Sequence, residues 1–152
     1  MKVFSGILYL TACLALGSSP VTASDDWPAA SDYLFMASDC ATADDPERCQ
    51  YIKDDWKRDY EGAISGAYQG QRNVAFCLST GCDTPGFRKN PVLGCAWRVV
   101  IVSSGHLVSD ETDGRNMAFY CGPEFLDDTG RLMADAQART ILKKLGITLP
   151  SQ

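Results

Sequence analysis

RNVAFCLSTGCDTPGFRKNPVLGCAWRVVIVSSG, residues 72–105, is the stretch that decides the fold. Its first arm, residues 72–81, carries apolar side chains at helical spacing, and its second arm, residues 90–105, is apolar nearly all round. A helix that is apolar on every face is buried between other helices rather than exposed on a surface. The stretch therefore predicts a helical hairpin whose second arm lies in the core.

The second arm has clear start and stop signals. Asn90 is a good N-cap, Pro91 suits the first helical position, and Gly105 suits the position just after a helix. These signals bound one helix of the hairpin, and the apolar positions between them are its buried residues.

The opening of the first arm recurs later in the chain. RNVAF at residues 72–76 returns as RNMAF at residues 115–119, 43 residues further on. A period of roughly 20–50 residues is typical of helical repeat arrays. The recurrence predicts a short helical-repeat, α/α solenoid-like architecture.

The rest of the chain also reads as helical. Asp45 and Pro46 form a strong helix start, Gly70 is expected to break the helix that follows, and Asp127 is a candidate cap for the last helix. No stretch alternates apolar and polar residues in the way that strands do. Residues 25–30 form a polar lead that is expected to fray. We expect an all-α fold with helices at residues 31–38, 46–68, 72–81, 90–105, 113–121 and 127–145.

The first 23 residues read as a signal peptide. An apolar stretch follows Lys2, and Val21-Thr22-Ala23 suits a signal-peptidase cut after residue 23. The apolar run is too short for a convincing membrane span. A competing interpretation takes Leu10-Thr11-Ala12-Cys13 as a lipoprotein acylation site, anchored through Cys13. Residues 1–23 are thus predicted to be removed, leaving residues 24–152 as a single helical-repeat domain.

The charge of the mature chain limits its partners. Loss of Lys2 leaves 13 of the 14 basic residues against 19 acidic ones, a net charge of −6. An acidic surface disfavours nucleic acid and anionic membrane as partners. We therefore expect a partner protein, no nucleic acid, and no membrane insertion after signal removal.

Six cysteines remain in the mature chain. An even number in an exported domain predicts disulfides formed in an oxidising compartment, so a periplasmic or secreted protein is expected. Cys77 and Cys82 have the spacing C-x4-C with no clustered histidine, so a zinc site is not expected. The expected helix directions favour one set of pairs, with Cys77–Cys95 as its chief rival. That set is Cys40–Cys49, Cys77–Cys82 and Cys95–Cys121.

Residues 90–105 resemble the second helix of a Sel-one-like repeat, a relative of the tetratricopeptide repeat. That helix opens with Asp-Pro, carries a small and an aromatic residue at its middle, and closes with Gly; here these places hold Asn90-Pro91, Ala96-Trp97 and Gly105. Val74-Ala75 and Gly81 occupy the corresponding places of the family's first helix. A second, partial copy begins at residue 116, and the resemblance covers about residues 63–145. It implies an adaptor that binds protein and performs no catalysis.

A search for catalytic chemistry agrees with that implication. The sole histidine, His106, falls in a turn between helices and is expected to be solvated. Neighbouring carboxylates at Asp54-Asp55 and Asp127-Asp128 suit a solvated face and a helix cap, because adjacent helical residues diverge by about 100°. There is no phosphate-binding glycine loop. No catalytic residue, cofactor or metal ligand is predicted.

The aromatic residues divide into two groups. Core positions are expected for Trp56, Tyr60, Phe76, Trp97 and Phe119, because of their helical spacing. Trp27 and Tyr51 are left unassigned. In a solenoid the first helices of successive repeats line the concave face, so Tyr68 and Tyr120 are predicted as partner-binding contacts.

The sequence thus favours an exported, disulfide-stapled adaptor domain. The alternative is a periplasmic inhibitor or immunity protein that blocks a secreted hydrolase, which small size, acidity and cysteine bridges would also suit. A small hydrolase is disfavoured because no site is found. An ordered acidic loop shaped to plug a cleft would favour the inhibitor, whereas a groove lined by aromatic residues would favour the adaptor.

Overall fold

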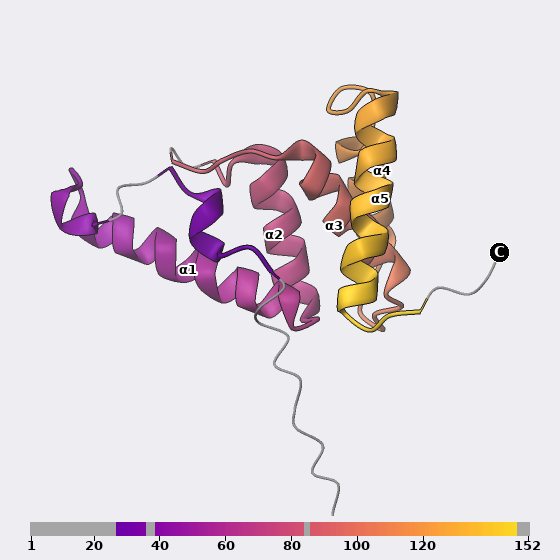
Figure 1. Cartoon of the computed structure of the whole chain (residues 1–152), viewed down its shortest axis with the longest axis horizontal. Coiled ribbons are helices and arrows are strands. Elements are labelled where there is room, and N and C mark those ends of the chain that lie inside the picture. Colours follow the sequence, from indigo (N-terminus) through magenta and orange to yellow (C-terminus); the bar gives the residue numbers. More distant parts are fainter. Residues whose placement is uncertain (1–26, 36–38, 84–85, 149–152) are drawn as a thin grey trace, which may run out of the picture.

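The computed structural model describes residues 27–35, 39–83 and 86–148, and these residues form an all-α domain stapled by disulfides, as predicted (Figure 1). They contain no strand, only an isolated bridge between Leu34 and Phe87. The predicted signal peptide and Cys13 lie outside the described residues. None of the helices described is long and apolar enough to cross a membrane. The elements are η2 (Ala30–Tyr33), η3 (Cys40–Thr42), α1 (Pro46–Ile64), α2 (Tyr68–Thr80), α3 (Pro91–Ser103), α4 (Glu111–Tyr120) and α5 (Asp128–Lys144).

Three helices begin where their cap residues predict. The side chains of Asp45, Asn90 and Asp127 each accept a hydrogen bond from the backbone amide three residues further on. This bond satisfies one of the amides that the first turn of a helix leaves unpaired. A proline follows both Asp45 and Asn90 as the first residue of α1 and α3, where its missing N–H costs nothing.

The predicted boundary between the first two long helices was wrong. α1 ends before Gly66, whose φ of +89° makes the turn, and α2 begins at Tyr68. Gly70 does not break a helix; it lies inside α2 and faces α1. A Cβ at Gly70 would lie 2.7 Å from the backbone nitrogen of Ala63 and 2.7 Å from the carbonyl oxygen of Asp59. Gly70 is therefore the position that lets the two helices approach closely.

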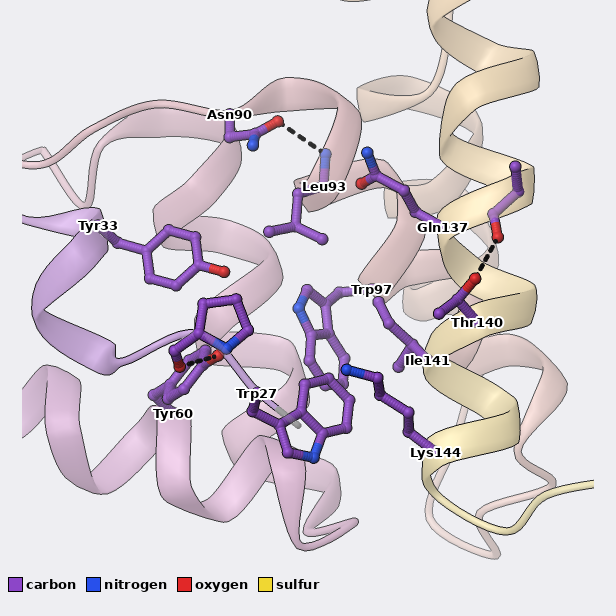
Figure 2. A pocket seen from close by; sticks show the side chains of 12 residues that line it. Trp27, Tyr33, Tyr60, Asn90, Leu93, Trp97, Gln137, Thr140, Ile141 and Lys144 are labelled. Atoms are coloured by element: carbon purple, nitrogen blue, oxygen red, sulfur yellow. Dashed lines mark hydrogen bonds between the residues drawn. The ribbon is translucent and has the colours of Figure 1, made fainter. Parts of the chain in front are cut away.

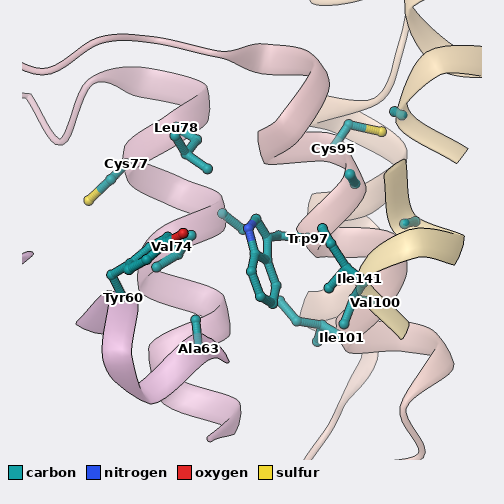
Figure 3. Packing of buried hydrophobic residues seen from close by; sticks show 14 of the residues in the cluster. Tyr60, Ala63, Val74, Cys77, Leu78, Cys95, Trp97, Val100, Ile101 and Ile141 are labelled. Atoms are coloured by element: carbon teal, nitrogen blue, oxygen red, sulfur yellow. The ribbon is translucent and has the colours of Figure 1, made fainter. Parts of the chain in front are cut away.

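α3 is the central helix, and its burial confirms the prediction for the second arm. It packs on α2, α4 and α5. Trp97 is 1% exposed and lies between α2 and α5, beside Ile141 and Val100 (Figure 3). Leu78 of α2 is fully buried in the same cluster. The core thus forms around the second arm of the hairpin.

Two of the five aromatic residues predicted to be core are not buried. Trp56, Tyr60 and Trp97 are buried, but Phe76 is 39% exposed and Phe119 is 55% exposed. These two occupy the same position in the two copies of the RNxAF motif. Helical spacing identifies an apolar face, but it does not show whether a neighbouring element covers that face.

The described part of the N-terminal lead does not fray; it docks on the helices. The hydroxyl of Tyr60 donates to the carbonyl oxygen of Pro28 at 2.8 Å, and the indole Nε1 of Trp56 donates to the carbonyl oxygen of Ala30 at 2.7 Å. Trp27 stacks on Trp97. Of the helix expected at residues 31–38, a four-residue 3-10 turn is present, and residues 36–38 lie outside the described ranges. We call residues 27–34 the N-terminal segment.

The three disulfides are those that the helix directions favoured. They join Cys40 to Cys49, Cys77 to Cys82, and Cys95 to Cys121. The rival pair Cys77–Cys95 is not formed. The first bridge ties η3 to α1, the second spans the end of α2, and the third ties α3 to the end of α4.

Candidate functional site

A pocket of about 430 Å³ lies between the N-terminal segment, α3 and α5 (Figure 2). Its lining is mainly aromatic and aliphatic, with a few polar side chains from α5. Pockets of this size and lining are the usual candidates for binding sites. The lining residues include Trp27, Tyr33, Tyr60, Leu93, Trp97 and Ile141, and on the polar side Gln137, Thr140 and Lys144.

Two tryptophans form one wall of this aromatic pocket. The rings of Trp27 and Trp97 are stacked, with centroids 5.9 Å apart and planes 20° from parallel. The ammonium group of Lys144 lies 4.8 Å from the centroid of the Trp27 ring, within cation–π range. Figure 2 shows these three side chains on the same side of the pocket. Because Trp97 is fixed in the core, it gives Trp27 a rigid surface to stack on.

Tyr33 and Tyr60 form the opposite wall. Their rings are 5.5 Å apart, and the Tyr60 hydroxyl holds the N-terminal segment through the carbonyl oxygen of Pro28. Burial raises the pKa of both Tyr33 and Tyr60 above the usual value of a phenol. Both phenols therefore stay neutral, so they present apolar ring surface with a hydroxyl hydrogen-bonding group.

The polar side of the pocket is formed by one face of α5. The Oε1 atom of Gln137 is buried and has no hydrogen-bond partner among the described residues. Such an orphaned amide oxygen is costly unless a donor reaches it. Thr140 and Ala136, on the same face, are exposed. An occupant could thus meet aromatic surface on one side and hydrogen-bonding side chains on the other.

A second cavity extends the first beneath the N-terminal segment. It measures about 810 Å³ and lies between that segment and α1. Trp27, Pro28 and Tyr60 line both cavities. The N-terminal segment is therefore bordered by a cavity on each of its two sides.

The two tyrosines predicted as partner contacts lie elsewhere. The hydroxyl of Tyr68 donates to Asp113 Oδ2 at 2.6 Å, and the ring of Tyr120 lies 4.0 Å from the guanidinium carbon of Arg98. Both are partly buried, on α2 and α4, and neither lines the aromatic pocket. Their contact role stays a prediction.

His106 is less solvated than expected. It is half-buried, its Nε2 lies 2.9 Å from Gln71 Oε1, and its ring packs at 5.3 Å from that of Tyr68. No acidic side chain hydrogen-bonds to the imidazole among the described residues. The described ranges also contain no group of three or more His, Cys, Asp or Glu side chains placed to hold a metal ion.

The sequence reasoning missed the N-terminal segment and α5 as walls of one site. Trp27 lies in a lead without helical periodicity, and Tyr33 lies in a short predicted helix of which only a 3-10 turn forms, so no pattern shows which surface they contact. Gln137 lies on a helix whose pattern predicts only which face is apolar. The sequence offers one signal for this site, which is the presence of two aromatic residues close to Pro28.

The fold and the pocket together define a class: an all-α domain, stapled by three disulfides, with an aromatic pocket beside its central helix. Comparison of the chain with protein-family models, with curated proteins and with solved structures finds no match in any of the three.

Proposed function

We propose that this protein is an exported adaptor that binds a segment of another protein in the aromatic pocket and performs no catalysis. The observation that carries the proposal is the pocket itself, an aromatic groove open to solvent along α5. An aromatic groove favours an adaptor over an inhibitor, which would present a protruding loop. The Sel-one-like resemblance supports the same function.

The pocket's chemistry indicates what kind of segment it takes. Stacked indoles bind apolar or aromatic side chains, and aromatic anchors carry much of the binding energy at protein interfaces. The orphaned amide of Gln137 favours a segment that also offers a hydrogen-bond donor, such as a backbone N–H. We therefore propose an extended segment with an apolar side chain in the pocket and its main chain along α5.

Export to the periplasm or the cell exterior is the second part of the proposal. It is supported by the apolar leader sequence and by three disulfides, which persist in oxidising compartments. Intact mass of exported protein tests this part. We expect a chain that begins at Ser24 with all six cysteines oxidised; a diacylated chain that begins at Cys13 would contradict it.

A matched pair of substitutions on α5 tests the binding site. Thr140→Trp places an indole into the pocket from an exposed position, whereas Asp135→Trp adds the same side chain on the same helix outside the pocket. Proteins captured from the exported fraction by the mature domain should be retained by D135W and lost by T140W. Equal capture by both variants would contradict the pocket as the binding site.

The inhibitor alternative is favoured by one specific observation. The turn between α3 and α4 projects two apolar side chains into solvent, Leu107 at 103% and Val108 at 64% exposure, followed by Asp110 and Glu111. An exposed apolar tip next to acidic residues suits insertion into a cleft. Leu107→Asp separates the two functions. Under the adaptor proposal it leaves capture unchanged, whereas under the inhibitor alternative it abolishes capture and T140W does not.

A further inference from the structure

A polar cleft lies between the two copies of the RNxAF motif, on the side of α3 that faces α2 and α4. It measures about 450 Å³. The first copy contributes Arg72, Asn73 and Phe76, and the second contributes Asn116, the counterpart of Asn73. The repeated motif thus brings two side-chain amides to one cleft. This cleft shares no residue with the aromatic pocket.

Arg98 of α3 also lines this cleft, and its charge is buried. The residue is 5% exposed, and its guanidinium carbon lies 4.0 Å from the centroid of the Tyr120 ring. Its Nε is buried without a hydrogen-bond partner, and Arg98 forms no ion pair within the described ranges. Burial lowers the pKa of Arg98 to about 10. A buried cation without a counter-charge is costly, so this arrangement favours an anion from outside the chain.

The carboxylate of Asp113 does not fill that need, because its oxygens are already engaged. Oδ1 lies 3.2 Å from Arg72 Nε, while Oδ2 accepts from the hydroxyls of Tyr68 at 2.6 Å and Ser109 at 3.2 Å. Arg72 therefore has its counter-charge on α4. Among the described residues, Arg98 is left with no carboxylate paired directly to its guanidinium: Asp113 attracts it only at longer range, and the neighbouring charge of Arg72 opposes that attraction.

We propose that this cleft binds the carboxylate of a small organic acid, with Arg98 as the counter-charge. One uncompensated charge matches a monoanion better than a phosphate dianion, and a guanidinium matches the planar geometry of a carboxylate. The amide of Asn116 supplies a further donor, and Asn73 Nδ2, which already donates to Asp59 Oδ2 at 3.0 Å, has a second N–H to offer. Phe76, 39% exposed at the rim, offers apolar surface to the carbon skeleton. The volume lies within the usual range for small-molecule sites.

Titration of the mature protein with propionate, phenylpropionate and inorganic phosphate tests the proposal. The readouts are the melting temperature and the ¹H–¹⁵N signal of Arg98 Nε, at ligand concentrations up to tens of millimolar, which detect a dissociation constant on the order of 1 mM. We expect saturable shifts with the two acids, larger with phenylpropionate, and at most a minor shift with phosphate. A wild-type Nε signal that none of the acids moves would overturn the proposal, as would a preference for phosphate.

Two variants and a control identify the site. Arg98→Met removes the counter-charge, and Arg115→Met removes an arginine whose side chain on α4 is 71% exposed. We expect R98M to lose the acid-dependent shift in melting temperature and R115M to keep it. If R98M does not fold, Asn116→Asp keeps the test decisive, because it places a carboxylate in the cleft and should abolish the shift in a folded protein. An unchanged shift in a folded R98M or in N116D would refute the site.

Two further measurements complete the test. One distinguishes a free acid from a carboxylate carried on a peptide, and the other distinguishes failure of the acid-binding proposal from failure of the adaptor proposal. A blocked peptide with an internal glutamate carries the same group on a chain; binding of this peptide without binding of the free acids would contradict a small-acid occupant. The T140W variant should bind acids as the wild type does. Loss of partner capture and loss of acid binding are therefore distinguishable failures.

Discussion

The indole of Trp97 belongs to both the core and the aromatic pocket. It is 1% exposed, packs among α2, α3 and α5, and supports the stacked ring of Trp27. Trp97→Ala should lower the free energy of unfolding by roughly 3–5 kcal/mol, since it removes buried apolar surface and leaves a cavity. Urea denaturation measures this loss. Leu107→Ala, at a fully exposed position, is the control and should change stability by less than about 0.5 kcal/mol. A loss well under about 1 kcal/mol for W97A would mean that α3 is not central.

Asp59 is a carboxyl group whose charged form is less favourable in the folded protein than in the unfolded chain. Burial raises its pKa above 3.8, although Asn73 Nδ2 donates to its Oδ2 at 3.0 Å and opposes the shift. Above pH 3.8 the folded state therefore holds this proton more tightly than the unfolded chain does, so stability falls as pH rises through the folded pKa. Asp59→Asn removes the charge but keeps an acceptor for Asn73. The stability of wild type minus that of D59N should decrease from acidic to neutral pH. An increase over that range would show that the charged form is the stabilised one.

At the scale of elements, two glycines of the first two helices should respond oppositely to alanine. A methyl at Gly70 would meet backbone atoms at 2.7 Å, whereas one at Gly62 would meet its nearest neighbours, Ala67 Cβ and Gly70 Cα, at 3.7 Å, an ordinary contact. Gly70→Ala should cost roughly 1–3 kcal/mol by forcing the helices apart. Gly62→Ala should be neutral or stabilise by up to about 1 kcal/mol, because alanine is the better helix former. Thermal unfolding of the pair tests this, and equal effects would refute close packing at Gly70.

Most element boundaries could be predicted from the sequence because caps act locally. Asp45, Asn90 and Asp127 each bond an amide only three residues away, so neighbouring residues suffice to predict them. Gly70 was misread because the same missing Cβ that ends a helix also allows two helices to touch. Phe76 was misassigned to the core because its exposure depends on elements distant in sequence.

At the scale of the whole molecule, neither cleft could be derived from local pattern. The aromatic pocket joins Trp27 to Lys144 across most of the chain, and no periodicity relates its walls. Part of the polar cleft could be identified from the sequence, because the RNxAF recurrence supplies the residues on two of its sides. The third side is formed by Arg98, which lies in an otherwise apolar helix. A single arginine in such a helix does not show from the sequence whether the folded protein pairs it with a carboxylate.

α4 is the element that most depends on a disulfide. Its only buried residue is Asp113, so little apolar packing holds it to the rest of the fold. Cys121, just after its last residue, is bonded to Cys95 of the central helix across 26 residues of sequence. The Cys77–Cys82 bridge spans only 5 residues and lies at the end of a well-packed helix. The longer bridge should therefore contribute more, both through chain entropy and as the anchor of α4.

Paired serine substitutions test that difference. Each double variant should lose about 2–4 kcal/mol, and C95S/C121S should lose roughly 1.5 kcal/mol more than C77S/C82S by the loop-length relation. Hydrogen exchange gives the sharper readout. In C95S/C121S the amides of α4 should exchange much faster while those of α1 and α2 stay protected, because local opening of a poorly buried element needs no global unfolding. In C77S/C82S protection of α4 should be unchanged. If α4 stayed as protected as in wild type after its bridge was removed, side-chain packing and the Arg72–Asp113 ion pair would be sufficient to hold it.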